Sequence, residues 1–205
     1  MSEMTYLFFL YQARKRKGEL FCMKLRELSG LSAETILEKF GETNKHPVNI
    51  EKILQKLGIE STPIDFSLIE NANKELVERR GHILGAVTLS ESDVHIYYSS
   101  NPEYPETRKR FTLAHELAHC CLNPEVIGTQ GHIEFRFDEA NLNDMNEVMA
   151  NRFAGKLLVP KDELIKVYDE MIVPLSDVLA KEFNVGRHVM EARLKDLELP
   201  FYSPT

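Results

Sequence analysis

Two histidines four residues apart, His115 and His119, are the side chains of this sequence best suited to chemistry. On an α-helix, side chains at that spacing lie one above the other on the same face, so both imidazoles can reach one metal ion without bending the backbone. Glu116 projects to the side, where it can hold a water bound to the metal. Because a zinc ion lowers the pKa of such a water to roughly 7 and so makes a hydroxide-like nucleophile available at neutral pH, the pattern predicts a Zn²⁺ hydrolase. The plainer interpretation is two surface histidines on an ordinary helix.

A hydrolytic zinc ion usually takes three protein ligands and leaves one position for water. A metzincin would have a third histidine six residues after His119, where this chain has glutamate, so that class is excluded. The remaining downstream donors are Glu125, His132, Glu134, Asp138 and Glu147. We favour Glu147, because it begins a second helix whose apolar face could pack on the first and carry the carboxylate to the metal. The alternative is that Asp144 caps this helix and Glu147 completes a capping box.

Four other side chains are candidates for supporting roles. Asn151, one turn after Glu147, is placed to hydrogen-bond a metal ligand. Arg110 could orient the substrate or stabilise an oxyanion, or it could pair with an acidic neighbour on the surface. His132 and Tyr97 are candidates for an additional transition-state donor, although packing or surface roles are commoner for both residue types.

Hydrophobic periodicity and capping residues predict the elements that must position these side chains. Helices are expected over 32–40, 50–57, 107–122, 144–158 and 161–172, with two short helices around Asn184-Val185-Gly186 in the segment 176–199. Strands are expected over 59–64 and 132–137. The segments 83–89 and 94–98 are expected to form a hairpin with its turn at 90–93, whereas residues 66–79 fit neither pattern.

Two segments resemble the ImmA/IrrE metallopeptidase family. The run from Arg110 to His119 is similar to the family's signature, and the run from Glu147 to Pro160 is similar to its second block. Residues 46–59 resemble the family's opening helix, so the resemblance covers about residues 46–160. It implies a gluzincin-like site in which His115, His119 and Glu147 bind zinc and Glu116 is the general base. It also implies a protein substrate, since family members typically cleave a helix-turn-helix transcriptional repressor encoded nearby, often in mobile-element or stress-response systems.

We therefore expect an α+β fold: a zincin-like core with a small, mostly antiparallel sheet over the metal helix, and a helical C-terminal tail. Residues 1–22 would be an N-terminal extension, 23–172 the zinc metallopeptidase domain and 173–205 the tail. The residue pattern of the tail resembles that of a helix-turn-helix, but its basic and acidic residues are balanced, which weakens a DNA-binding interpretation. Packing or docking of a protein partner is the favoured role of the tail.

The composition limits the possible partners and compartments. The 205 residues carry 25 Lys+Arg and 32 Asp+Glu, a formal net charge of −7, so the chain as a whole repels a phosphate backbone and nucleic-acid binding is not expected. Cys22, Cys120 and Cys121 form no visible disulfide framework, which favours a reducing, cytoplasmic location. Because Cys120 and Cys121 directly follow the metal motif, they could compete for zinc or sense oxidants, but small core residues are the favoured interpretation.

The apolar run at residues 6–11 is too short to span a bilayer, and a basic cluster follows it rather than precedes it, so neither membrane insertion nor export is expected. The sequence thus predicts a cytoplasmic zinc endopeptidase. The alternative is a regulatory protein that keeps the metal site but binds a repressor without cutting it, or binds DNA through the tail.

Overall fold

The computed structural model describes residues 25–89, 94–122, 132–138 and 144–203. The turn expected at 90–93 and the extension expected at 1–22 lie outside these ranges. The helices are α2 (Leu25–Leu28), α3 (Ala33–Phe40), α4 (Ile50–Leu57), α5 (Ser67–Ala72), α6 (Lys74–Arg80), α7 (Glu106–Leu122), α8 (Met145–Leu158), α9 (Lys161–Asp169), α10 (Ser176–Glu182) and α11 (Arg187–Asp196). The strands are β1 (Glu60–Ile64), β2 (Ile83–Leu89), β3 (Val94–Ser99) and β4 (His132–Phe137).

The four strands form one mixed sheet in the order β1-β3-β2-β4. β2 pairs antiparallel with β3 and with β4, whereas β1 pairs parallel with β3. The expected α+β fold with a small, mostly antiparallel sheet is therefore confirmed. Within the described strands β4 is an edge, paired with β2 alone.

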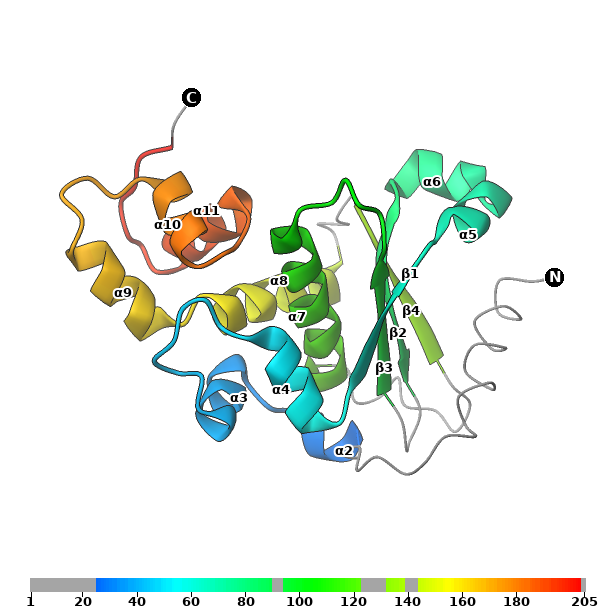
Figure 1. The fold of residues 1–205 in the computed structure, drawn as a ribbon, viewed down its shortest axis with the longest axis horizontal. Helices are drawn as coiled ribbons and strands as arrows, with labels where there is room; N and C mark the ends of the chain where they lie inside the picture. Colours follow the sequence, from blue (N-terminus) through cyan, green and yellow to red (C-terminus); the bar gives the residue numbers. More distant parts are fainter. Residues whose placement is uncertain (1–24, 90–93, 123–131, 139–143, 204–205) are drawn as a thin grey trace.

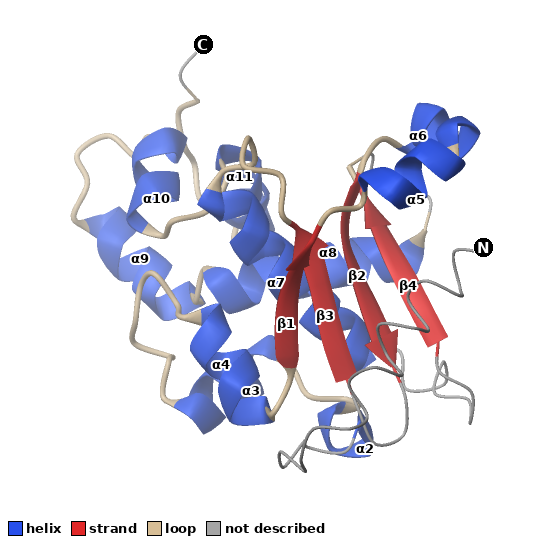
Figure 2. Ribbon diagram, turned by 45° about the vertical axis from the view of Figure 1, so that its right-hand side comes forward, coloured by secondary structure: helices blue, strands red, loops and turns tan. Residues whose placement is uncertain are grey.

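Helix α7 lies against one face of the sheet, and α8 packs on α7 (Figure 1). The helices α5 and α6 lie at one end of the sheet (Figure 2). One apolar cluster joins Val87 and Ile96 of the sheet to α4, α7, α8 and the C-terminal helices. A second, smaller cluster contains Tyr97 and Phe137 together with Phe66 and Ile69 from the start of α5. Because neighbouring strand residues point to opposite faces, Ile96 and Tyr97 belong to opposite sides of the sheet.

Capping residues begin and end α3 and α4 where the sequence predicts. The side chain of Ser32 accepts a hydrogen bond from the Thr35 amide, 3.1 Å away, and Gly41 ends α3 with φ +69°. Asn49 caps α4 by accepting from the Lys52 amide at 2.9 Å, and Gly58 ends it with φ +72°. Side-chain oxygens at the first position satisfy orphan amides, and glycine adopts the left-handed conformation at little cost, so both helices have defined lengths.

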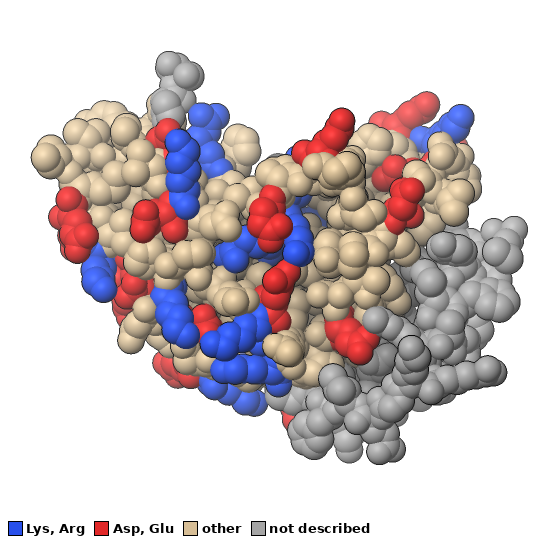
Figure 3. All heavy atoms as spheres, viewed as in Figure 1, with Lys and Arg blue, Asp and Glu red and all other residues tan. Residues whose placement is uncertain are grey.

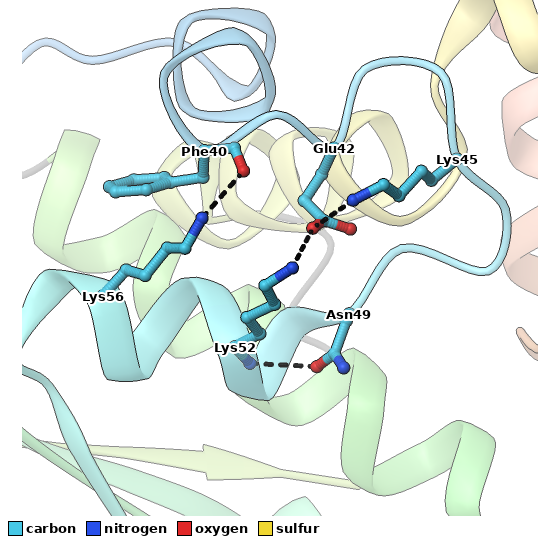
Figure 4. A network of polar contacts seen from close by, with 6 residues as sticks. All are labelled: Phe40, Glu42, Lys45, Asn49, Lys52 and Lys56. Atoms are coloured by element: carbon cyan, nitrogen blue, oxygen red, sulfur yellow. Dashed lines mark hydrogen bonds and ion pairs between the residues drawn. The ribbon is translucent and has the colours of Figure 1, made fainter.

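A polar network fixes the segment between α3 and α4 (Figure 4). The buried Glu42 carboxylate lies 2.9 Å from the Lys45 ammonium and 3.3 Å from that of Lys52. Lys56 donates a hydrogen bond to the Phe40 carbonyl at 3.1 Å. These contacts tie the end of α3 to α4, which packs on α7.

The two short C-terminal helices are also confirmed, as α10 and α11, and they pack on the core. Phe183 and Leu194 are fully buried in the cluster that contains α7 and α8. Arg193 donates a hydrogen bond to the Val159 carbonyl, 3.1 Å away, just after the end of α8. The expected division between residues 172 and 173 falls in the connection between α9 and α10.

Acidic and basic side chains are interspersed over the face of the molecule shown in Figure 3. No helix in the described ranges is long and apolar enough to cross a membrane.

Candidate metal centre

The site lies between α7 and α8, where three donor side chains meet. His115 and His119 are 1% and 2% exposed, and their Nε2 atoms are 2.9 Å apart. From α8, Glu147 places Oε2 3.3 Å from Nε2 of His115 and Oε1 3.4 Å from Nε2 of His119. Among the described His, Cys, Asp and Glu residues, these three form the group that could hold a metal ion.

The dimensions and chemistry of this group fit a small tetrahedral ion. Zinc–nitrogen and zinc–oxygen bonds of about 2.0–2.1 Å in tetrahedral geometry separate ligand atoms by about 3.3 Å. The observed separations of 2.9, 3.3 and 3.4 Å are close to that value. Two imidazoles and one carboxylate also form a donor set found in zinc hydrolases. Zinc therefore fits the residues present, and His115, His119 and Glu147 would hold it.

The start of α8 explains how Glu147 reaches the histidines. The side chain of Asp144 caps the helix by accepting from the Asn146 amide at 3.0 Å. Glu147 then lies in the first turn, with its carboxylate directed at the imidazoles. Both helices bury alanines, among them Ala118 on α7 and Ala154 on α8, which are fully inaccessible. Such small side chains let two helix backbones approach closely.

Asn151, one turn further along α8, contacts the ring of His115 from the other side. Its Oδ1 lies 3.0 Å from Nδ1 of His115. When Nδ1 donates this hydrogen bond, the neutral ring keeps the lone pair on Nε2, the atom that faces the other donors. Burial, together with the positive charge of Arg136, lowers the pKa of His115 to about 3, so the imidazole is neutral at neutral pH. Neutral imidazole is the form that binds metals.

The carboxylate of Glu147 is held in its ionised form. Its contacts with His115 and then with His119 keep the pKa of the Glu147 carboxyl well below its usual range. An ionised carboxylate beside two neutral imidazoles provides one negative charge and two lone pairs for a divalent ion.

Glu116 is 1% exposed and lies between α7 and the sheet. The glycine at position 85 of β2 makes room for it. A Cβ atom on Gly85 would lie 2.5 Å from Cγ2 of Thr112 and 3.2 Å from Oε1 of Glu116. The absence of a side chain at Gly85 therefore lets α7 rest on β2 with the Glu116 carboxylate against the strand.

Arg136 is a residue of this site that our sequence predictions missed. It lies on β4 directly opposite Gly85, and its guanidinium carbon is 4.7 Å from the centroid of the Phe111 ring on α7. Burial lowers the pKa of Arg136, while the charges of Glu116 and Glu147 raise it. The sequence did contain a signal, because residues 132–137 (His-Ile-Glu-Phe-Arg-Phe) alternate polar and apolar, which assigns Arg136 to the face opposite Phe135 and Phe137.

The structure places Arg110 in neither of the two environments considered for it. Its side chain is buried, and its Nε donates to the Asn184 carbonyl at 3.0 Å while Nη2 donates to the Val48 carbonyl at 2.9 Å. These donors are directed at backbone carbonyls from the segment before α4 and from the turn between α10 and α11. Arg110 therefore joins three parts of the fold rather than binding substrate or a surface carboxylate.

The structure does not bring Tyr97 to the histidines and places it in a packing role instead. Its ring belongs to the apolar cluster on the face of the sheet opposite α7, and it packs 4.4 Å from the His95 ring, centroid to centroid. A side chain there cannot contribute to chemistry at the histidines. His132 begins β4 opposite Leu89, but its side chain lies outside the described part of the chain, so its proposed role stays a prediction.

The other candidates for a third ligand can be placed only in part. Asp138 pairs with Arg108 at 3.0 Å and is not part of the metal group. Glu125 and the side chain of Glu134 lie outside the described ranges.

Cys120 and Cys121 are core residues, as favoured. Both are buried in the main apolar cluster, and Cys120 donates from Sγ to the Glu116 carbonyl at 3.3 Å. Burial raises the pKa of Cys121 to about 12. A thiol with that pKa is neither a ready metal ligand nor a reactive nucleophile at neutral pH.

Comparison with known proteins places this geometry in a family. A family model described as the IrrE N-terminal-like domain, Peptidase_M78, matches residues 95–195. The match extends from β3 to α11 and includes His115, Glu116, His119 and Glu147. Comparisons with curated proteins and with solved structures gave no match. The chain belongs to the ImmA/IrrE family and carries its metallopeptidase domain.

Proposed function

We propose that this protein is a cytoplasmic zinc endopeptidase that cleaves a helix-turn-helix transcriptional repressor. In this proposal His115, His119 and Glu147 hold the metal and Glu116 is the general base. The observation that carries it is the triangle of donor atoms, 2.9–3.4 Å on each side, formed by α7 and α8 in a chain of a metallopeptidase family. The family resemblance supports the repressor as the substrate.

Each residue of the proposed site has its own role in hydrolysis. A zinc ion bound by the three ligands supplies Lewis-acid chemistry, polarising the scissile carbonyl and lowering the pKa of the attacking water. Glu116 takes a proton from that water as its oxygen bonds to the carbonyl carbon. The carbon–nitrogen bond then breaks, and Glu116 returns the proton to the leaving amine. Asn151 holds the His115 ring in the orientation and tautomer that this arrangement needs.

The test uses the purified, zinc-loaded protein and the repressor encoded beside its gene. We expect a single cut in the repressor, mapped by mass spectrometry of the products. Glu116→Gln should abolish cleavage while the zinc content stays at about one ion per chain, because Glu116 is not a metal ligand. Glu106→Gln, an exposed carboxylate on the same helix, is the matched control and should cleave normally.

Two outcomes would contradict the proposal. If the wild-type protein binds the repressor tightly but leaves it intact, the non-cleaving regulatory alternative is correct. If Glu116→Gln cleaves as fast as the wild-type protein, the catalysis belongs to another site or to a contaminant.

A further inference from the structure

Arg136 is a cation inside the proposed active site whose hydrogen-bonding capacity is not used up. Its Nη1 atom is buried, and within the described residues no hydrogen-bond partner lies within reach of it. A buried donor left without a partner costs free energy, so proteins rarely keep one unless something else uses it. An arginine is cationic at any physiological pH and cannot escape this cost by losing its proton.

Three observations place the guanidinium near the catalytic groups. Arg136 and Gly85 are directly opposed on β4 and β2, and Gly85 is the residue against which the Glu116 carboxylate packs. Phe111, whose ring lies under the guanidinium, is one turn before His115, and the two rings are 6.3 Å apart. Arg136 is also close enough to act electrostatically on His115, Glu116 and Glu147. The positive charge therefore lies on the face of the sheet that α7 covers, near the general base and the metal ligands.

Two other arginines show what a purely structural arginine looks like in this fold. Arg80 lies over the Phe137 ring at 4.3 Å, in the cluster on the opposite face of the sheet. Arg108 lies over the Tyr104 ring at 4.5 Å and also pairs with Asp138 at 3.0 Å. Arg136 has the same kind of aromatic contact, but it lies on the face of the sheet covered by α7, and its buried Nη1 has no hydrogen-bond partner among the described residues.

We propose that Nη1 of Arg136 donates a hydrogen bond to the substrate's scissile carbonyl oxygen as that oxygen acquires negative charge. This inference rests on the proposed function. When the oxygen of water bonds to the carbonyl carbon, the carbon–oxygen π pair moves onto the carbonyl oxygen, and a preorganised cation with a free donor stabilises that charge. The charge returns to the carbonyl when the carbon–nitrogen bond breaks. Arg136 gains and loses no proton in either step.

The experiment compares Arg136→Met, Arg136→Lys and the control Arg80→Met in zinc-loaded protein. Methionine keeps an apolar stem over Phe111 but has no donor, so kcat should fall about 100- to 1000-fold, the usual effect of losing one oxyanion donor. Lysine retains the charge without the planar fork and should recover part of the rate. Arg80→Met removes an arginine that lies over the ring of Phe137, which belongs to β4 like Arg136 but lies on the opposite face of the sheet. This control should cleave like the wild-type protein.

Three further measurements separate this role from a structural one. Affinity for the intact repressor, measured in the Glu116→Gln background, should change less than about threefold on adding Arg136→Met, because the bond forms only as charge develops. A phosphinic peptide with the mapped cleavage sequence imitates the tetrahedral anion, and its inhibition constant should rise in proportion to the loss of kcat/KM. Zinc content should not fall, since Arg136 is not one of the metal ligands.

The inference is overturned if Arg136→Met cleaves like Arg80→Met, if it loses zinc together with its activity, or if it weakens repressor binding without lowering kcat. Each of these results gives Arg136 a different role while leaving the proposed function standing. If the wild-type protein itself cleaves nothing, the proposed function fails first and this inference fails with it.

Discussion

Glu116 packs against Gly85 so closely that a Cβ atom on the glycine would lie 3.2 Å from the carboxylate oxygen Oε1. The proposed general base is thus positioned by a residue with no side chain, 31 positions earlier in the chain. The same hypothetical Cβ would lie 2.5 Å from Cγ2 of Thr112, one turn before Glu116 on α7. The spacing between the metal helix and the sheet is therefore set at Gly85.

Replacing Gly85 by alanine should push α7 away from β2. We expect Gly85→Ala to lower the free energy of unfolding by about 1–3 kcal/mol, the usual cost of overpacking a core, and to lower the cleavage rate as well. Adding Thr112→Ser removes the closer clash and should recover part of both losses. Urea denaturation and cleavage assays measure the two effects.

Gly155 on α8 provides the control for Gly85. A Cβ there would meet nothing within 4 Å, so Gly155→Ala should raise the free energy of unfolding by about 0.5–1 kcal/mol through helix propensity. If the two alanine substitutions changed the free energy of unfolding equally, close packing around Gly85 would not be the reason that a glycine is needed there.

Asn151 should tune zinc affinity through His115. Asn151→Leu removes the acceptor 3.0 Å from Nδ1 of His115, and loss of such a partner typically weakens metal binding about 10- to 100-fold. Asn151→Asp keeps an acceptor and should retain affinity. Competition with a chromophoric chelator measures the constants, with Asn146→Ala, an exposed residue of the same helix, as control. Unchanged affinity in Asn151→Leu would remove Asn151 from the proposed mechanism.

Zinc should stabilise the folded protein, because its three ligands come together only in the folded state. At a free zinc concentration about 100 times the Kd, the free energy of unfolding should rise by about 2.7 kcal/mol, which raises Tm by about 5–10 °C in a chain of this size. His119→Ala should lose this response. His82→Ala, which removes an exposed histidine paired with Glu70, should keep it, and an equal loss in both variants would point to zinc bound elsewhere.

Arg110 should matter for stability rather than for chemistry. Arg110→Met leaves the carbonyls of Val48 and Asn184 without their donors, at about 1–3 kcal/mol for each buried group, so we expect a loss of about 2–4 kcal/mol in urea denaturation. Arg152→Met, whose side chain is 66% exposed, should change stability by less than about 0.5 kcal/mol. A large fall in kcat with unchanged stability would reinstate a catalytic role for Arg110.

Local patterns were sufficient for most of the fold. Caps such as Ser32 and Gly58 mark helix ends because the capping contacts involve residues two to four positions away. The sequence pattern does not predict the short helices α5 and α6, and α6 in particular buries none of its residues and so has no apolar periodicity. The parallel pairing of β1 with β3 was also not predicted, because register between distant strands depends on contacts that no local pattern encodes.

For the site residues too, local spacing could be predicted from the sequence, whereas contacts between distant segments could not. The spacing of His115 and His119 is a property of one helix, and the structure brings Glu147 and Asn151 to them by packing α8 on α7. The side on which Tyr97 lies could not be predicted, because β3 is buried on both faces and its sequence does not show which side a residue faces. The contacts of Arg110 could not be predicted either, because its partners are backbone carbonyls 62 and 74 residues away, which have no sequence signature.

The near-complete burial of α7 also determines which parts of the molecule can open independently. From Thr112 to Cys121 every residue of this helix is buried, between the sheet on one side and α4 and α8 on others. Amide hydrogens there can exchange with solvent only when most of the molecule unfolds, whereas those of α6, which buries no residue, can exchange through local opening. Native-state exchange should therefore show the slowest amides clustered around His115, and the arrangement of the two imidazoles should persist until the global transition.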